Sequence, residues 1–381
     1  MRRQLPVHSP TTYHSLLTGL LGAAGVDSRD RVESLIKKHW SAPDVLLTDS
    51  GTTALTLAIK AAVPAGGVVA LPAWGCYDLA TAAAGTDARV VLYDVEPATL
   101  APDSASLQRA LAHGARAVVV AHFYGVPVDM EAVTRSAAAS GAIVIEDAAQ
   151  AVGATWRGRP AGAVGALGVL SFGRGKGLNG GGGGALLINN VAVPKVDLDA
   201  GAGFGELVRA SAQWLLARPA LYALPASLPF LRLGDTIFHA PRAPRGLSRA
   251  SARMLLANWE DALAATTVRR RNAERLQVTA ATAGWHTIRV PEGGEAGYLR
   301  MPILGAASNR HGRVADGARL GIMPAYPQTL PSLAAFRGCC INASEAFPGA
   351  VELADRLVTL PTHALLTDTD LRRIEAWLAG S

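Results

Sequence analysis

Short apolar runs alternate with longer amphipathic stretches through the first half of the chain. The runs are rich in Val, Leu, Ile and Ala and fall at residues 45–48, 68–71, 90–93, 117–121 and 143–146. Runs of this kind are typical of strands buried on both faces, and the stretches between them, such as 53–62 and 130–140, have helical spacing. The pattern therefore predicts an α/β fold with a mostly parallel central sheet flanked by helices.

The pattern changes beyond about residue 247. A long helical stretch passes through Arg269, Arg270 and Arg271, and short strands and a last helix near 370–378 follow. We expect a large domain over 1–246 and a smaller C-terminal α/β domain over 247–381, with a helix at 32–40 that could pack on the smaller one. The three arginines are expected on a solvated helix face or at a contact between subunits.

Three groups with complementary chemistry lie between residues 144 and 184. Asp147 ends an apolar strand, Ser171 starts a loop that runs into five glycines, and Lys176 lies in that loop. A carboxylate keeps a pyridine nitrogen protonated, a lysine amine reacts with an aldehyde and later moves a proton, and hydroxyl and N–H donors hold a phosphate. The combination predicts a site for pyridoxal 5'-phosphate (PLP).

A second phosphate-binding segment is expected earlier in the chain. Gly51 and Thr52 lie between the run at 45–48 and an amphipathic helix, and the N–H groups at the start of such a helix favour anions. The two segments would form one cup.

Simpler interpretations stay open at this stage. Asp147 could be only a helix cap, Lys176 a solvated loop residue, and the glycines a flexible turn. A Walker A loop is excluded, because Gly177 follows Lys176 where Ser or Thr is required and Leu170 replaces the first glycine.

Seven blocks of the chain follow the order of one known family. They are SGTTAL from Ser50, LPAWGCYDLATAAAG from Leu71, VVLYDVEP from Val90, AHFYGVPVDM from Ala121, IEDAAQAVGA from Ile145, SFGRGKGLNGGGGG from Ser171 and FPGAVELADRLVTLPTH from Phe347. With these blocks the chain resembles the DegT/DnrJ/EryC1/StrS family of PLP-dependent aminotransferases, which mostly act on nucleotide-linked keto-sugars. The resemblance implies a fold type I PLP-dependent transferase.

Roles for individual residues follow from the resemblance. It implies that Asp147 pairs with the pyridine nitrogen, Gln150 contacts the ring hydroxyl side and Lys176 is the Schiff-base lysine. The residues implied to hold the phosphate are Gly51, Thr52 and Ser171. Relatives that remove a sugar hydroxyl have histidine at the lysine position, so Lys176 favours transamination.

Several positions depart from the family pattern. The residue expected to stack on the cofactor ring is Cys76, with Trp74 and Tyr77 beside it, and we select Tyr77. The segment with which a neighbouring subunit often completes the phosphate site has no clear counterpart. The usual Pro-Leu-His near the substrate is replaced in the region 326–330, which leaves the acceptor open.

The resemblance implies transfer of an amino group, with L-glutamate as the expected donor and a nucleotide-linked keto-sugar as the expected acceptor, in a homodimer. A PLP-dependent dehydratase or aromatizing enzyme on the same scaffold is one alternative. The other is a non-catalytic PLP-binding regulatory protein.

Composition narrows the choice of partners. The net charge of +6 suits anionic ligands, but the arginines are spread along the chain without a nucleic-acid-binding motif, so no nucleic acid is expected. The three cysteines lack metal-ligand spacing and there is no HExxH pair, so we expect no metal site and a reduced, cytoplasmic protein.

The segment 204–239 resembles the family least. It is rich in Leu, Ala and Trp, but its prolines and arginines interrupt any apolar span of membrane length. A helical hairpin against a partner subunit is the favoured interpretation, and docking on a membrane surface is the alternative.

Overall fold

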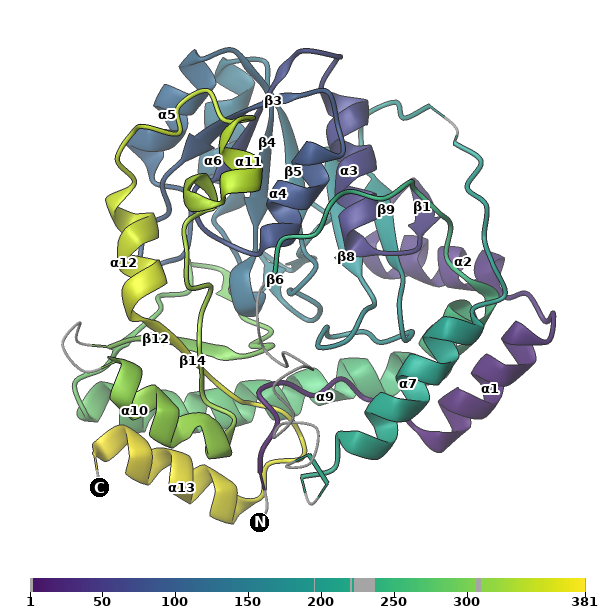
Figure 1. Cartoon of the computed structure of the whole chain (residues 1–381), viewed down its shortest axis with the longest axis vertical. Coiled ribbons are helices and arrows are strands. Elements are labelled where there is room, and N and C mark those ends of the chain that lie inside the picture. Colours follow the sequence, from purple (N-terminus) through teal and green to yellow (C-terminus); the bar gives the residue numbers. More distant parts are fainter. Residues whose placement is uncertain (1–2, 195, 220, 223–236, 306–309, 381) are drawn as a thin grey trace.

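The computed structural model describes the chain except residues 1–2, 195, 220, 223–236, 306–309 and 381. Its centre is a seven-stranded sheet in the order β1-β9-β8-β5-β4-β2-β3 (Figure 1). The strands are β1 (Asp44–Thr48), β2 (Val68–Pro72), β3 (Arg89–Tyr93), β4 (Ala115–Ala121), β5 (Ile143–Asp147), β8 (Leu167–Ser171) and β9 (Gly184–Ile188). Neighbours from β8 to β3 are parallel, and β9 is antiparallel to β8 and β1. The expected mostly parallel sheet is confirmed.

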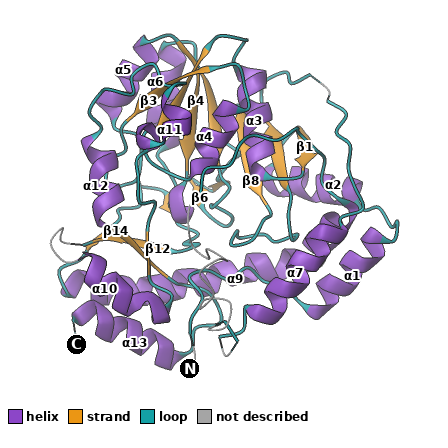
Figure 2. Cartoon of the chain, in the orientation of Figure 1, coloured by secondary structure: helices purple, strands orange, loops and turns teal. Residues whose placement is uncertain are grey.

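Helices cover both faces of this sheet (Figure 2). On one face, α3 (Gly51–Ala62) and α4 (Tyr77–Ala84) share a core with Val69 and Leu71 of β2. On the other, α5 (Ser104–Ala112) and α6 (Met130–Ala139) pack with Val68 and Ala70. Successive side chains of a strand point to opposite faces, so a strand covered on both sides must be apolar at every position.

A smaller antiparallel sheet forms in the last third of the chain, in the order β10-β12-β14-β13. Its strands are β10 (His286–Thr287), β12 (Met301–Leu304), β13 (Met323–Pro324) and β14 (Leu357–Leu360), and the nearby helices are α10 (Arg310–Gly317), α12 (Pro348–Arg356) and α13 (Asp368–Ala379). The short helix α11 (Ala334–Arg337) lies beside α4 instead (Figure 1). A third sheet joins β11 (Gly294–Glu295) to β6 (Thr155–Trp156) and β7 (Arg159–Pro160), which links this region to the loop after β5.

The helix α9 (Arg249–Thr282) spans both regions. Its first half packs Leu255 and Trp259 into a core with α2 (Arg29–Trp40), β1 and β9. Its second half packs Ala273 and Leu276 against the smaller sheet. The domain boundary near residue 247 stays a prediction, and the helix expected at 32–40 belongs to the first of these two cores.

The expectation that Arg269 lies on a solvated face is wrong, because its side chain is 1% exposed. Its guanidinium donates to the carbonyls of Gly297 at 3.1 Å and Val152 at 3.4 Å and to Thr266 Oγ1 at 2.7 Å. Hydrogen bonds to these three oxygens replace the hydrogen bonds to water that the guanidinium loses when it is buried. Burial lowers the pKa of Arg269 to about 10.

Two helices carry apolar side chains that face solvent. They are α1 (Tyr13–Ala23) and α7 (Phe204–Leu216), which lie beside each other and against α9 (Figure 1). The exposed side chains, here called the α1–α7 surface, are Tyr13, Leu17, Leu20, Leu21, Phe204, Val208 and Leu215.

Much of the segment 204–239 lies outside the described residues, at 220 and 223–236. Within the described part of the chain, no helix is both long and apolar enough to cross a membrane. The hairpin and the membrane-docking interpretations stay predictions.

Candidate active site

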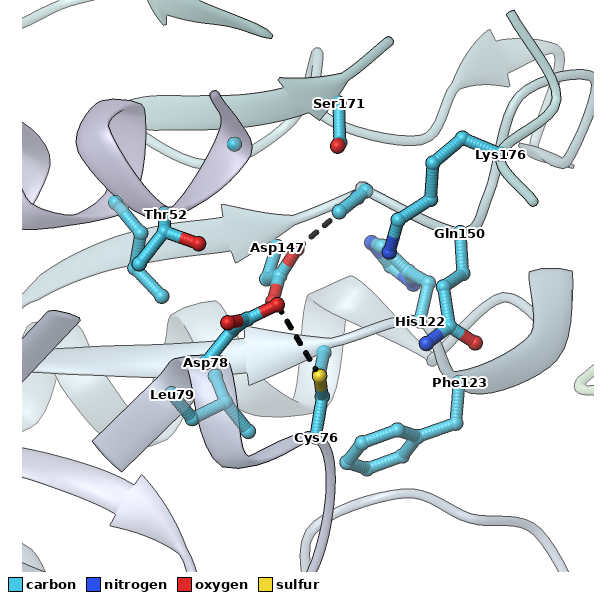
Figure 3. A pocket seen from close by; sticks show the side chains of 14 residues that line it. Thr52, Cys76, Asp78, Leu79, His122, Phe123, Asp147, Gln150, Ser171 and Lys176 are labelled. Atoms are coloured by element: carbon cyan, nitrogen blue, oxygen red, sulfur yellow. Dashed lines mark hydrogen bonds between the residues drawn. The ribbon is translucent and has the colours of Figure 1, made fainter. Parts of the chain in front are cut away.

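A single open cavity of about 490 Å³ gathers six of the seven residues singled out in the sequence. It lies at the carboxyl ends of β4, β5 and β8, the edge at which open α/β sheets bind ligands (Figure 3). The six are Gly51, Thr52, Asp147, Gln150, Ser171 and Lys176. The structure shows that these six residues line one cavity, and their individual roles stay predictions.

The two phosphate-binding segments come into close contact. Ser50 caps α3 by accepting a hydrogen bond from the Thr53 N–H at 3.1 Å, and Gly51 and Thr52 follow at the N-terminus of that helix. A Cβ on Gly51 would lie 2.7 Å from Ser171 Cβ, so only glycine permits this approach. The helix N-terminus and Ser171 thus lie side by side, as the predicted phosphate cup requires.

The glycine run after Lys176 makes specific contacts. Gly183 has a φ of +109°, bridges to the backbone of Ser50, and would bring a Cβ within 2.3 Å of Leu247. Gly184 packs on the same part of the chain, where a Cβ would lie 2.5 Å from the Ser50 carbonyl carbon. Close packing, rather than flexibility alone, requires glycine here.

Asp147 ends β5, and its Oδ1 accepts a hydrogen bond from the Ala149 N–H at 3.0 Å. The helix-cap interpretation is wrong, because a turn and then β6 follow Asp147 instead of a helix, and the carboxylate lines the cavity. Burial raises the pKa of Asp147, while the Ala149 hydrogen bond and the charge of Lys176 lower it. A desolvated carboxylate in this position favours a cationic ligand such as a protonated pyridine nitrogen.

Lys176 lies in a tight loop, and Gly175 before it has a φ of +74°. Its carbonyl accepts a hydrogen bond from Ser9 Oγ at 2.5 Å, which ties the loop to the N-terminal segment. Its side chain points into the cavity beside Gln150 and His122 (Figure 3). Lys176 is thus placed as a cavity residue rather than as a solvated loop lysine.

The structure does not bring Tyr77 to this cavity. Tyr77 is the first residue of α4, and its ring is 4% exposed within the core between α3 and the sheet. Trp74 is fully buried and donates from Nε1 to the Tyr326 carbonyl at 3.0 Å. Cys76, the residue before α4, lines the cavity instead, together with Phe123.

The cavity residues that sequence reasoning missed include Asp78, His122 and Phe123. The Cys76 thiol donates to Asp78 Oδ2 at 3.5 Å, and burial raises the pKa of that thiol. Both His122 and Phe123 directly follow β4. Their position after a predicted buried strand was the signal that could have identified them.

His122 forms a buried pair with Glu146 beneath the cavity. The two side chains are 1% and 0% exposed, and His122 Nε2 lies 3.7 Å from Glu146 Oε1. His122 Nδ1 accepts a hydrogen bond from the Val128 N–H at 3.1 Å, so the proton of the neutral ring is on Nε2. The proton is therefore on the side facing the carboxylate.

The donor set fits a phosphorylated pyridine aldehyde. The cup at Gly51 and Ser171 suits the phosphate, the buried Asp147 carboxylate suits the ring nitrogen, and the Lys176 amine suits the aldehyde. Within the described residues, no group of three or more His, Cys, Asp and Glu side chains is arranged to hold a metal ion.

A mostly parallel sheet with a lysine, a carboxylate and a phosphate cup at its carboxyl edge defines the class of PLP-dependent transferases of fold type I. The sequence model of the DegT/DnrJ/EryC1/StrS aminotransferase family matches residues 23–196. The L-glutamine:2-deoxy-scyllo-inosose aminotransferase of Streptomyces lividus is 32% identical over 361 residues, which cover 86% of this chain and 79% of that protein. The chain belongs to this PLP-dependent family, and the expected resemblance is confirmed.

Two further comparisons define the extent of the likeness. An enzyme of the same name from Streptoalloteichus tenebrarius is 32% identical over 236 residues, or 62% of this chain, and the match spans about half (52%) of that protein. The crystal structure of the aminotransferase TlmJ from Streptoalloteichus hindustanus superposes with a TM-score of 0.78 at 23% identity and covers 99% of this chain and 98% of its own. The expected fold type I architecture is confirmed.

Proposed function

We propose that the protein is a PLP-dependent aminotransferase that moves an amino group from an amino acid to a keto carbon of a sugar or sugar-like ring. The meeting of Lys176, Asp147 and the phosphate cup in one cavity carries this proposal. Each of these groups alone has a simpler explanation, but together they match the three ends of the cofactor.

Each of these residues would have a separate role towards the cofactor. When bound, PLP supplies the electron sink that stabilises negative charge on the reacting carbon. Asp147 would hold a proton on the ring nitrogen, and Gly51, Thr52 and Ser171 would hold the phosphate. The Lys176 amine, once released by an incoming donor amine, would carry the proton between the substrate carbon and the cofactor carbon. Gln150 would orient the ring from its hydroxyl side.

The relatives' names point to a donor and an acceptor that differ from the first expectation. They name L-glutamine rather than L-glutamate, and an inosose rather than a nucleotide-linked sugar. We therefore propose L-glutamine as the donor and a cyclic keto-polyol such as an inosose as the acceptor. L-glutamate and a nucleotide-linked keto-sugar are the second choices.

The test starts from the absorption spectrum of the PLP-loaded protein. We expect L-glutamine to convert the bound cofactor to its pyridoxamine form, and a keto-polyol to reverse the change. A stable pyridoxamine form without amino-donor turnover would instead indicate the dehydratase or aromatizing alternative. If neither L-glutamine nor L-glutamate changes the absorption of the bound cofactor, the regulatory alternative is indicated. Failure to bind PLP would refute the cofactor assignment.

We also propose that the protein works as a homodimer that buries the α1–α7 surface. Seven large apolar side chains on two adjacent helices are exposed, and clusters of exposed apolar side chains often mark a protein–protein contact. Light scattering should give twice the 39.4 kDa chain mass, and Val208→Glu should lower it towards one chain mass. Val351→Glu, on the exposed face of α12, is the matched control and should leave the dimer intact.

A further inference from the structure

Arg300 is a partly buried cation, and none of the described residues forms a carboxylate ion pair with it. It precedes β12, and its Nη2 donates to the Thr359 carbonyl of β14 at 3.2 Å. Its Nε is buried and has no hydrogen-bond partner among the described residues. Burial lowers the pKa of Arg300 to about 10, so the guanidinium still carries its charge at neutral pH.

The surroundings of Arg300 favour an anion. The groups that interact with it electrostatically are the hydroxyls of Tyr124, Tyr222 and Tyr326, and no Asp or Glu of the described chain is among them. His363 is also close, and burial lowers the pKa of that ring to about 4, so it is neutral. A buried charge without a counter-ion is costly, and a ligand anion would remove that cost.

Two of these tyrosines are linked to the cavity by hydrogen bonds. Gln150, which lines the cavity, donates from Nε2 to the Tyr326 hydroxyl at 2.5 Å and accepts from the Tyr124 N–H at 3.0 Å. Since Tyr326 accepts from Gln150, its own O–H remains free to donate. Burial raises the pKa of both tyrosine hydroxyls, which therefore stay protonated.

The backbone at Tyr124 is strained to build this arrangement. Tyr124 has a φ of +56°, a conformation that bulky residues rarely adopt. The strain places its ring parallel to that of Tyr326, with centroids 5.8 Å apart and an interplanar angle of 19°. Strained residues cluster at ligand-binding sites, where the surrounding structure holds them in place.

Two more arginines extend the positive charge towards solvent. Tyr222 interacts electrostatically with Arg174 and Arg3 as well as with Arg300. Arg174 is exposed and lies two residues before Lys176, in the same loop. The anion would therefore approach along a positively charged path beside the lysine.

We propose that Arg300, with the Tyr124 and Tyr326 hydroxyls, binds the α-carboxylate of the amino-acid donor. The planar guanidinium and a carboxylate form paired, charge-assisted hydrogen bonds, and the tyrosine hydroxyls supply further donors. Gln150 lies between this site and the cavity, on the side implied for the ring hydroxyl, next to the carbon that receives the donor amine. The assignment rests on the proposed aminotransferase function.

A binding experiment tests the carboxylate site without any reaction. Glutaramate, the deamino analogue of L-glutamine, keeps a carboxylate but has no amine, so calorimetry on the PLP-loaded protein measures binding alone. We expect Arg300→Met to weaken binding about 10- to 100-fold, as loss of a hydrogen-bonded charge usually does. Arg289→Met is the matched control, since Arg289 is exposed and paired with Glu96 at 3.4 Å, and its binding should equal that of the unaltered protein.

A second measurement uses the unaltered protein and so survives misfolding of the variant. Conversion of the bound cofactor by L-glutamine should saturate at a concentration at least 10-fold lower than with 4-aminobutanamide, which lacks only the carboxylate. Equal saturation by the two amines would overturn the proposal. The proposal would also be overturned if the Arg300→Met protein bound glutaramate with unchanged affinity, or if the substitution changed only the acceptor concentration needed for saturation.

The two levels of the proposal fail differently. If L-glutamine and L-glutamate both leave the cofactor unchanged while glutaramate binding still depends on Arg300, the aminotransferase function fails and the carboxylate site stands. If the cofactor reacts normally with L-glutamine in the Arg300→Met protein, the carboxylate site fails and the function stands. Arg300→Lys, which keeps the charge but not the planar fork, should bind glutaramate with intermediate affinity.

Discussion

The two walls of the cavity are built in different ways. On the wall from the parallel sheet, polar side chains such as Asp147 and Ser50 lie at or just after the end of a strand and accept a hydrogen bond from a neighbour two or three residues away. On the wall towards the smaller sheet, the contacts join distant residues. Gln150 and Tyr326 are 176 positions apart, and Trp74 and Tyr326 are 252 apart.

This difference separates two tasks. The local wall holds the groups that match a common cofactor, so short segments that fold in one way are sufficient. Behind the distant wall, Gln150 connects to the tyrosines and to the Arg300 cation, none of which lines the cavity or is expected to hold the cofactor phosphate or ring nitrogen. Substrate choice can therefore change through the smaller sheet while the cofactor groups stay in place.

Loss of the lysine should have the largest effect on the local wall. Lys176→Ala should lower the rate of donor-driven cofactor conversion by about 10²- to 10⁴-fold or more, because the variant lacks the amine that moves the proton. Single-turnover absorption measures the rate, and circular dichroism checks the fold. An unchanged absorption of lysine-bound cofactor would contradict the assignment.

The second largest effect is expected at Arg269, which connects the two walls. Arg269 binds carbonyls of the loops after β5 and before β12, so Arg269→Met should leave them unpaired and reduce the free energy of unfolding by about 2–4 kcal/mol. Urea unfolding measures the loss. Arg271→Met, at an exposed position of the same helix, should change stability by less than about 0.5 kcal/mol.

Asp147 should lower the stability of the cofactor-free protein and strengthen PLP binding. Burial raises its folded-state pKa above the ordinary aspartate value of 3.8, so ionisation destabilises the cofactor-free protein as the pH rises through that folded-state pKa. Asp147→Asn should therefore be more stable than the unaltered protein at pH 7, by about 1–3 kcal/mol, and the difference should shrink below pH 4. Thermal unfolding at both pH values tests the sign.

The same variant should bind PLP more weakly, because an amide cannot hold the ring nitrogen in its protonated form. Equal stability at pH 7 together with unchanged PLP affinity would show that Asp147 serves only the local turn at Ala149.

The smallest effect is expected on the distant wall. Tyr326→Phe removes one hydroxyl and its hydrogen bond from Gln150, which usually contributes about 0.5–1.5 kcal/mol. The donor concentration that gives half-saturation should rise about 2- to 10-fold, with little change in PLP binding. Tyr298→Phe is the control, because the Tyr298 hydroxyl accepts a hydrogen bond from Gln277 and Tyr298 does not line the cavity. A larger effect on PLP than on the donor would contradict the division between the walls.

The sequence by itself determined most of the fold and the local wall. Buried strands must be apolar throughout, and a cap or glycine that follows one acts on its own neighbours, so β1 to β5 and the positions of Gly51, Asp147 and Lys176 could be predicted. The family blocks then connected these positions to one cofactor.

The tertiary structure decided what depends on distant contacts. Whether Arg269 faces solvent or carbonyls depends on loops that a helical pattern does not contain. Tyr77 and Cys76 are adjacent in the chain, and the packing of α4 on α3 determines that the tyrosine enters the core while the thiol lines the cavity. Arg300 interacts electrostatically with Tyr124 and Tyr326, which lie on other parts of the chain, and no local pattern encodes that approach.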